Sequence, residues 1–153
     1  MKAVIQRVRK GSVSVGGKKI STIKRGMVIL LGVGPEDKKE QAEKLAQKIS
    51  HLRIFEDQNG KMNLSLLDIA GEALVVPQFT LYADTRRGHR PSFTDAAPPT
   101  IAEPLVDYFA SCLESLGISA PMGEFGAHMQ VEIHNDGPVT IMLESREKSR
   151  EKS

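Results

Sequence analysis

Two short segments of this chain place polar side chains and unusual backbone beside apolar runs, Pro77-Gln78-Phe79-Thr80 and residues 135–140. In the first segment, Gln78 offers an amide that can orient a substrate amide or hydroxyl group. If the preceding strand stops pairing here, the backbone N–H groups near Phe79 and Thr80 become available to a developing oxyanion. Thr80 is the best hydroxyl candidate, but its residue type alone favours a strand position where the methyl group packs. None of these groups identifies a substrate.

The second segment, Asn135-Asp136-Gly137-Pro138-Val139-Thr140, matters because of its Gly-Pro step. Proline removes a backbone N–H group and fixes φ, and an X-Pro bond is the one place where a cis peptide bond is readily accessible. Such a step between two strands can point bare carbonyl groups outward, which suits selection by shape. Asp-Gly between alternating apolar runs is also a strong β-hairpin signal, and spacing alone favours this hairpin turn.

Several common chemistries do not fit the sequence. The four histidines (His51, His89, His128 and His134) lack H-x-x-x-H spacing, and a single cysteine, Cys112, cannot complete a thiolate site, so we expect no metal. No phosphate-binding G-x-x-x-x-G-K-[ST], dinucleotide G-x-G-x-x-G or G-x-S-x-G motif is present. Gly32-Val33-Gly34 lacks the third glycine. We therefore expect no cofactor and no conventional pair of nucleophile and base.

The net charge of +2 is too small to indicate nucleic-acid binding by itself, so local clusters of basic residues decide the question. One cluster holds Arg7, Arg9, Lys10, Lys18, Lys19, Lys24 and Arg25, which we interpret as the solvated face of strands. The other is the loop Arg86-Arg87-Gly88-His89-Arg90, directly after the Gln78–Thr80 segment. Its position predicts phosphate contacts from Arg86, Arg87 and Arg90.

Hydrophobic patterning predicts the elements that carry these residues. Strands are expected over residues 3–8, 12–15, 18–21, 27–33, 73–76, 130–134 and 139–143, with another beginning near residues 53–55. Runs 27–33 and 73–76 are continuously apolar, as is typical of strands buried on both faces. The last two expected strands alternate, which indicates one buried and one exposed face. Residues 83–99 form a long loop, and loops of this length in compact domains are often functional.

Two helices are expected. The first would begin after an N-cap at Asp37, with Glu40 as its capping-box partner. Its buried stripe would comprise Ala42, Leu45, Ala46, Ile49 and Leu52. The second would begin with a capping box of Thr100 and Glu103, bury Leu105, Val106, Phe109, Leu113 and Leu116, and end at Gly117. We interpret Cys112 as a packing residue of this helix.

These elements predict a single mixed α/β domain with more strand than helix, spanning residues 1–145. Residues 146–153 contain no apolar side chain and are expected to be disordered. No apolar run approaches the ~20 residues that span a bilayer. The N-terminus lacks the apolar core of a signal peptide, and one cysteine cannot form an internal disulfide. We therefore expect a cytoplasmic protein with no membrane association.

Five segments in order resemble the D-aminoacyl-tRNA deacylase family over residues 1 to about 145. They are Val4-Ile5-Gln6-Arg7-Val8, Gln78-Phe79-Thr80-Leu81, Arg90-Pro91-Ser92-Phe93, Phe125-Gly126-Ala127-His128-Met129 and the segment at residues 135–140. The resemblance implies a layered α/β/β fold, a homodimer, no cofactor, and hydrolysis of the ester that links a D-amino acid, or misattached glycine, to the 3′ end of tRNA.

The resemblance also implies roles for individual residues. Gly137-Pro138 of one subunit would enter the partner's active site as a Gly-cisPro element and reject L side chains, with Arg7 holding it in place. Gln78, Phe79 and Thr80 would form the catalytic floor, and Phe125, Gly126, Ala127 and Met129 would contact substrate. Thr80 has two possible roles in this family: a nucleophile, or a dispensable residue beside backbone N–H groups, with the tRNA 2′-OH activating water. The second suits this chain better, since no base adjoins Thr80 in sequence.

The chain departs from the family at Pro77, where serine is usual and could donate a hydrogen bond. Two other functions stay open at this point. One is a tRNA-binding module without catalysis that uses the loop 86–90. The other is a small-molecule hydrolase with Thr80 as the nucleophile.

Overall fold

A computed structural model describes residues 1–146 of the chain. Strands β1 (Lys2–Val15), β2 (Lys18–Ile23), β3 (Gly26–Gly32), β6 (Glu72–Pro77) and β7 (Gln130–Glu144) form one five-stranded sheet. A separate hairpin pairs β4 (Phe55–Glu56) with β5 (Met62–Leu64). The helices are α1 (Lys39–His51) and α2 (Pro99–Ser115), and η1 (Phe79–Tyr82) is a short 3₁₀ turn. Apart from Arg146, the predicted tail lies outside the described residues.

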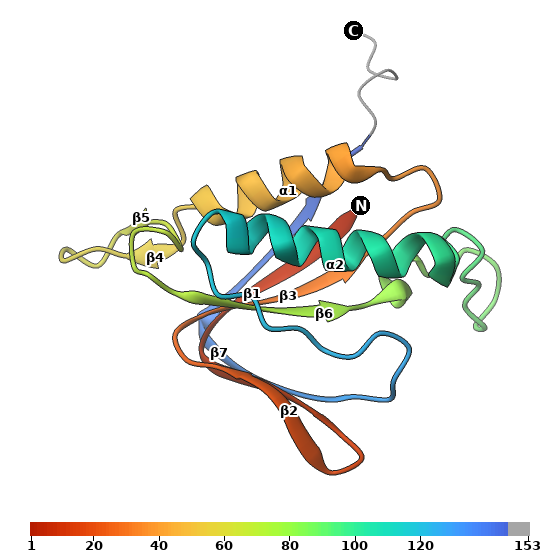
Figure 1. Ribbon diagram of the computed structural model, residues 1–153, viewed down its shortest axis with the longest axis horizontal. Coiled ribbons are helices and arrows are strands. Elements are labelled where there is room, and N and C mark those ends of the chain that lie inside the picture. The colour runs from red at the N-terminus through yellow and green to blue at the C-terminus, as the bar shows by residue number, and fades with distance from the viewer. Residues whose placement is uncertain (147–153) are drawn as a thin grey trace, which may run out of the picture.

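The long strand β1 organises the sheet. Its first half pairs with β3, its second half pairs with β2, and β7 runs antiparallel along both halves. Strand β6 joins the other edge of β3 in parallel, so the sheet is mixed. As Figure 1 shows, α1 and α2 lie side by side over one face of the sheet, while β2 and the adjoining end of β7 curl away from them. This arrangement confirms the expected mixed α/β fold with two main helices.

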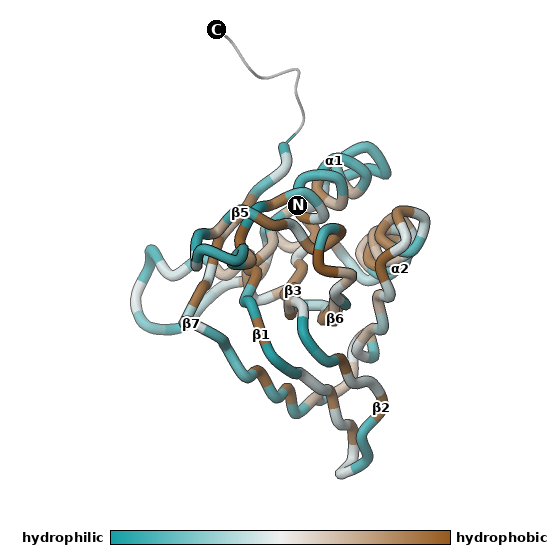
Figure 2. Tube along the Cα trace, turned by 90° about the vertical axis from the view of Figure 1, so that its left-hand side faces the viewer, coloured by the Kyte–Doolittle hydropathy of each residue, from teal (hydrophilic) through white to brown (hydrophobic). Residues whose placement is uncertain are grey.

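The core is divided between the two faces of the sheet. Under the helices, the larger cluster includes Ile5, Met27, Ile29, Ile49 and Phe109, all fully buried. A smaller cluster on the other face comprises Val8, Val13, Ile23, Val28, Leu74 and Val76. In Figure 2 the apolar segments gather between the helices and the sheet, with polar segments outside. Because β3 and β6 contribute to both clusters, they read as continuous apolar runs, as predicted.

At two places, two separately predicted strands are parts of one continuous strand. Residues 3–8 and 12–15 both belong to β1, and residues 130–134 and 139–143 both belong to β7. The hairpin turn expected at Asp136-Gly137 is therefore wrong. The chain instead passes through an irregularity and continues along the same partner strand, β1. The turn at Gly16-Gly17, where both φ values are positive, and the alternating burial of β7 are confirmed.

Both predicted capping boxes are wrong. Helix α1 is capped by Lys38, whose backbone N–H donates to Gln41 Oε1 at 2.7 Å. Helix α2 begins at Pro99, after an N-cap at Pro98 with no side-chain cap. Proline at the first helical position has no N–H group to satisfy, so the cap from Thr100 is not needed. The predicted buried stripes are confirmed, with Leu52 and Leu116 partly buried at their margins, and Gly117 ends α2 with φ of 90°.

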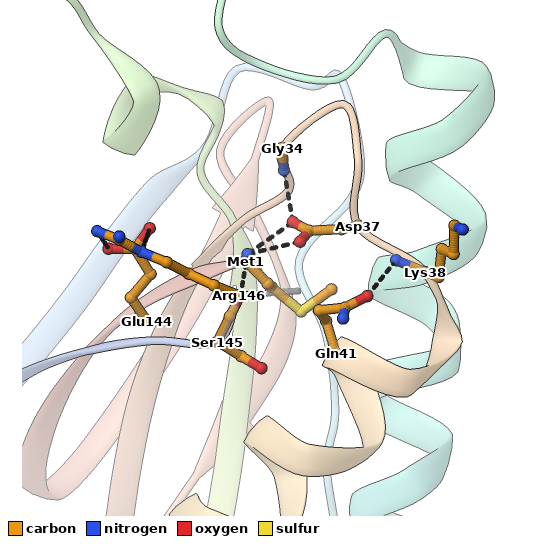
Figure 3. A network of polar contacts seen from close by, with 8 residues as sticks. All are labelled: Met1, Gly34, Asp37, Lys38, Gln41, Glu144, Ser145 and Arg146. Atoms are coloured by element: carbon orange, nitrogen blue, oxygen red, sulfur yellow. Dashed lines mark hydrogen bonds and ion pairs between the residues drawn. The ribbon is translucent and has the colours of Figure 1, made fainter. Parts of the chain in front are cut away.

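Asp37 contacts the chain terminus instead of capping α1. Its carboxylate accepts from the Met1 ammonium group at 2.8 Å and from the Gly34 N–H at 2.7 Å. The same ammonium group donates to the Ser145 carbonyl oxygen at 2.8 Å, as Figure 3 shows. These contacts join the start of β1, the end of β7 and the loop between β3 and α1.

Candidate active site

A cavity of about 650 Å³ opens where the parallel strands β3 and β6 end. The crevice outside the carboxyl ends of parallel strands is a common ligand site in open α/β sheets. Its lining is mostly apolar: Leu31, Val33, Val76, Pro77, Gln78, Phe79, Phe93, Ala96, Ala97, Pro98, Pro99, Ala102, Val106, Phe125, Gly126, Ala127, His128, Met129 and Val131. An apolar pocket with few polar groups suits a ligand whose shape matters more than its charge.

The 3₁₀ turn η1 begins beside this cavity, which Gln78 and Phe79 line. The Gln78 N–H still pairs with the Leu31 carbonyl oxygen at 2.8 Å, and sheet pairing stops after it. Among the described residues, no acceptor is recorded for the N–H groups of Phe79 and Thr80. The first N–H groups of a helical segment have no partner within it. The expectation that N–H groups become available where the strand stops pairing therefore fits the structure.

Thr80 lies in η1, beyond the end of β6 at Pro77, and not in the strand position that its residue type favours. Its side chain is exposed, and Thr80 Oγ1 accepts a hydrogen bond from Gln78 Nε2. No histidine or carboxylate contact is recorded for this hydroxyl within residues 1–146. An alcohol needs an adjacent base to act as a nucleophile at neutral pH, and this contact instead supplies a donor.

Phe79 is 56% exposed, and its ring meets the Phe93 ring edge to face, with centroids 5.0 Å apart. Phe93 thus ties the long loop before α2 to the 3₁₀ turn. This contact and the cavity wall formed by Ala102 and Val106 of α2 were missed as site features by the sequence analysis. The Arg90-Pro91-Ser92-Phe93 segment carried a signal for Phe93, whereas the α2 residues read only as core.

The cavity brings together most of the predicted substrate and catalytic residues. Gln78, Phe79, Phe125, Gly126, Ala127 and Met129 all line it. Thr80 and the basic loop do not line it, nor do Arg7, Gly137 and Pro138, which lie elsewhere on the same subunit. The interpretation of Arg7 as part of a solvated basic face is wrong, because this residue is only 7% exposed.

Arg7 reaches the predicted Gly-Pro element. Its Nε atom donates to the Asp136 carbonyl oxygen at 2.9 Å, and Nη1 donates to the Ile54 carbonyl oxygen at 2.7 Å. The Gly137-Pro138 peptide bond is cis, and both residues are exposed. A buried guanidinium therefore supports the backbone directly before the exposed element.

The basic loop is closed by backbone hydrogen bonds between Asp84 and Ser92 in both directions, at 2.7 and 2.9 Å. A second hollow of about 280 Å³ is lined by Asp84, Arg86, Arg87, Arg90, Ser92 and Thr94. The Arg86 guanidinium is bound to Asp84 through Nε and Nη2, at 2.9 and 2.8 Å, and it lowers the pKa of Asp84 to about 2. Arg87 and Arg90 lie beside this pair, and all three arginines are exposed.

No group of three or more His, Cys, Asp or Glu side chains that could hold a metal ion is found within residues 1–146. In the same part of the chain, no helix is both long and apolar enough to cross a membrane. Cys112 is partly buried against the core, and burial raises the pKa of its thiol. This environment agrees with a packing role.

Comparison with known proteins gives consistent matches over nearly the whole chain. Residues 4–144 match the family model of D-Tyr-tRNA(Tyr) deacylase. A D-aminoacyl-tRNA deacylase of Roseiflexus castenholzii is 63% identical over 145 residues, which cover 95% of this chain and 92% of the relative. One of Thermosipho africanus is 55% identical, with 95% and 98% covered.

Two solved structures share the fold. One, described as the c-Myc DNA unwinding element binding protein, superposes with a TM-score of 0.90 at 45% identity and covers 96% of this chain and all of that one. The other, a probable eukaryotic D-amino acid tRNA deacylase, gives a TM-score of 0.82 at 17% identity, over 93% of this chain and 97% of that one. At that identity, the second structure supports the fold alone.

Proposed function

Because the chain belongs to the D-Tyr-tRNA(Tyr) deacylase family, and is therefore an enzyme that hydrolyses the ester bond of D-aminoacyl-tRNA, we propose that the cavity at the ends of β3 and β6 is its active site. One observation carries this assignment. The Phe79 and Thr80 N–H groups, for which no acceptor is recorded in the described chain, stand beside an apolar cavity large enough for the end of a nucleotide and an amino acid. Glycine misattached to tRNA is a second substrate.

The reaction needs stabilisation of one developing charge. Water attacks the ester carbonyl carbon, and the carbonyl oxygen becomes an oxyanion that accepts hydrogen bonds from the N–H groups of Phe79 and Thr80. The bond between the carbonyl carbon and the ribose oxygen then breaks. The proton lost by the water passes to that leaving oxygen, which gives free D-amino acid and tRNA. The neighbouring 2′-OH of the terminal ribose activates the water, and no cofactor takes part.

Thr80 does not act as the nucleophile in this proposal. Its hydroxyl oxygen accepts a hydrogen bond from the Gln78 amide and has no recorded base beside it in the described residues. Gln78 in turn lines the cavity, so the pair orders the start of η1. In this proposal the side chains of Gln78 and Thr80 shape the catalytic floor. The backbone N–H groups of Phe79 and Thr80 bind the oxyanion.

Chiral selection is proposed to operate across a homodimer. Gly137-Pro138 of one subunit would enter the partner's cavity, where its carbonyl groups crowd an L side chain and leave room for a D side chain or glycine. Three observations support this arrangement: the element is exposed, it lies outside the cavity of its own subunit, and Arg7 supports the preceding carbonyl group. Selectivity then comes from a repulsive feature directed at the wrong substrate.

The rest of the tRNA would bind over the basic loop. Arg87 and Arg90 are exposed beside the Asp84–Arg86 pair, and the loop continues into Phe93 at the cavity. Phosphate contacts there would position the acceptor end of tRNA without reading sequence. An enzyme that acts on aminoacyl-tRNA would work in the compartment of translation, so we propose the cytoplasm.

The test is hydrolysis of matched D- and L-tyrosyl-tRNA by trace enzyme, in parallel with D-tyrosyl-tRNA that carries a 2′-deoxy terminal ribose. Rapid loss of the D ester, sparing of the L ester and a large loss with the deoxy substrate are expected. Thr80→Ala should keep most activity. Binding without turnover of either ester would support a tRNA-binding module instead. Cleavage of free D-aminoacyl esters that Thr80→Ala abolishes would indicate a small-molecule hydrolase.

A further inference from the structure

We propose that Asn135 is a specificity-positioning residue, whose side-chain amide fixes the shape of the loop that presents Gly137-Pro138. The inference rests on the proposed function and concerns how the rejecting element is held on its own subunit. It assigns no contact with substrate to Asn135.

The loop is an insertion within β7. Gln6 of β1 pairs with Thr140, and Val8 pairs with Asn135. Between these two pairs, β1 advances by two residues while β7 spans five. Residues 136–139 therefore have no ladder partner on β1, and other contacts must set their conformation.

The Asn135 side chain supplies one of these contacts from the base of the loop. Its Oδ1 atom accepts the Val139 N–H at 2.8 Å, and its Nδ2 atom donates to Thr140 Oγ1 at 3.1 Å. The Val139 N–H must face an oxygen, which fixes the orientation of the amide. Thr140 Oγ1 also accepts from Gln6 Nε2 at 3.1 Å, so the amide is anchored to β1.

The insertion is thus held on both sides of the Gly-Pro step. Arg7 holds the Asp136 carbonyl oxygen before it, and Asn135 holds the Val139 N–H group after it. Gly137 fits closely between the two, since a Cβ atom there would lie 2.9 Å from Val139 Cγ2 and 3.0 Å from Arg7 Nη2. Because this packing is close, a shift of Val139 would move the Gly137 and Pro138 carbonyl groups.

Two substitutions of nearly equal shape separate the hydrogen bonds from the bulk of the side chain. Asn135→Asp keeps an acceptor for the Val139 N–H, and its second oxygen can accept from the Thr140 hydroxyl. Asn135→Leu keeps the branched outline and loses both hydrogen bonds. His134→Ala is the matched control, because His134 is an exposed neighbour on the same strand.

The experiment measures kcat/KM of each full-length variant on D- and L-tyrosyl-tRNA, with thermal unfolding followed by circular dichroism. We expect Asn135→Leu to raise L-tyrosyl-tRNA hydrolysis about tenfold with D-tyrosyl-tRNA hydrolysis nearly unchanged, as for the loss of one or two positioning hydrogen bonds. For Asn135→Asp and for His134→Ala, the D/L ratio of kcat/KM should stay within about twofold of that of the parent protein. If Asn135→Leu does not fold, Asn135→Ala replaces it, and failure of both to fold would mean a purely structural role and overturn the proposal.

Pro138→Ala, measured in parallel, separates this inference from the proposed function. A change in the D/L ratio with Pro138→Ala but not with folded Asn135→Leu overturns the role of Asn135 alone. An unchanged ratio in both variants overturns selection by the Gly-Pro element itself. Equal loss of D and L activity in Asn135→Leu would also contradict the proposal, because a positioning role in rejection changes the ratio.

Discussion

The guanidinium group of Arg7 donates from Nε to the carbonyl oxygen of Asp136 at 2.9 Å, inside a site where the Arg7 side chain is only 8% exposed. The Asp136 carboxylate is farther from the same nitrogen, at 3.8 Å, and also lies 3.4 Å from Arg9 Nε. The backbone contact is therefore the specific one. It connects the middle of β1 to the insertion in β7, and the Nη1 contact with Ile54 extends this connection to the segment before β4.

Replacing Arg7 by methionine should lower both stability and chiral selectivity. The variant keeps much of the apolar stem but leaves the carbonyl groups of Ile54 and Asp136 without this donor. Losing hydrogen bonds to a charged donor costs about 2–4 kcal/mol of unfolding free energy. Urea denaturation and the D/L ratio of kcat/KM measure the two effects. Arg9→Met is the control, since Arg9 is 81% exposed and its ion pair should contribute less than about 1 kcal/mol. Equal effects of the two substitutions would contradict the assignment.

The interior of this fold was predictable because its signals are local. The apolar runs at residues 27–33 and 73–76 and the helical stripes of α1 and α2 lie where the pattern places them. The hairpin expected at residues 135–140 failed because Asn-Asp-Gly-Pro serves a tight turn and a strand insertion equally well. The choice depends on β1, which is long enough to pair with both halves of β7, more than a hundred residues away.

Asp37, near the start of α1, is a second residue whose role depends on a partner distant in the sequence. Its residue type and its spacing from Glu40 indicate a cap, but a stronger partner is present in the fold, the Met1 ammonium group. The role of Arg7 and the substrate contacts at residues 125–129 rest on the resemblance, whereas the segment at residues 77–80 also stands out by residue type. Gln78, Phe79 and the segment 125–129 meet at one cavity only after β6 and the chain before β7 are placed together.

Asp37→Asn should destabilise the protein by about 2–4 kcal/mol, because it removes the charge partner of an ammonium group whose residue is fully buried. The Ser145 carbonyl oxygen would remain as an acceptor, which limits the loss. Thermal or urea unfolding measures the change. Glu40→Gln breaks the exposed Glu40–Lys44 pair at 3.2 Å and should cost about 0.5 kcal/mol or less. If Asp37→Asn costs as little unfolding free energy as Glu40→Gln, the terminal ion pair contributes little.

Gly32→Ala should reduce turnover by displacing η1. A Cβ atom at this position would lie 3.0 Å from the Gln78 carbonyl oxygen and 3.2 Å from Leu81 Cβ, so the backbone beside the proposed active site must give by a few tenths of an ångström. Loss of one oxyanion donor typically costs about 10²–10³ in kcat, and partial displacement should cost about tenfold or more. Gly34→Ala is the comparison, because the three atoms nearest its Cβ would all belong to the Tyr82 side chain and none to the backbone. Steady-state kinetics should show the larger fall in kcat for Gly32→Ala; the reverse order would argue against a fixed turn.

Arg87→Gln and Arg90→Gln should each weaken tRNA binding and reduce the slope of log K against log salt by about one. Arg86→Gln should change the slope less, because Asp84 already binds its guanidinium through two nitrogen atoms. Binding of uncharged tRNA at several salt concentrations measures these slopes. Unchanged slopes for both Arg87→Gln and Arg90→Gln would place the phosphate contacts elsewhere.

The two tyrosines of the chain should resist ionisation in the folded protein. Burial, followed by the nearby carboxylates of Asp37 and Glu144, raises the pKa of Tyr82 well above its usual value of 10. The hydrogen bond to Glu43 is the main cause that raises the pKa of Tyr108 to about 12. The unfolded chain loses these protons near pH 10, whereas the folded chain retains them.

The unfolded state therefore binds fewer protons than the folded state above pH 10, and stability falls as pH rises through this range. The tyrosines' contribution to stability is complete below pH 10 and is lost as pH rises toward the folded pKa values. Tyrosinate absorbance should stay low at pH 10.5 and then rise together with the loss of the circular dichroism signal. Tyr108→Phe leaves Tyr82 as the single reporter and should show the same coincidence. In that variant, absorbance that rises near pH 10 while the fold persists would mean that Tyr82, at the end of η1, is accessible to water.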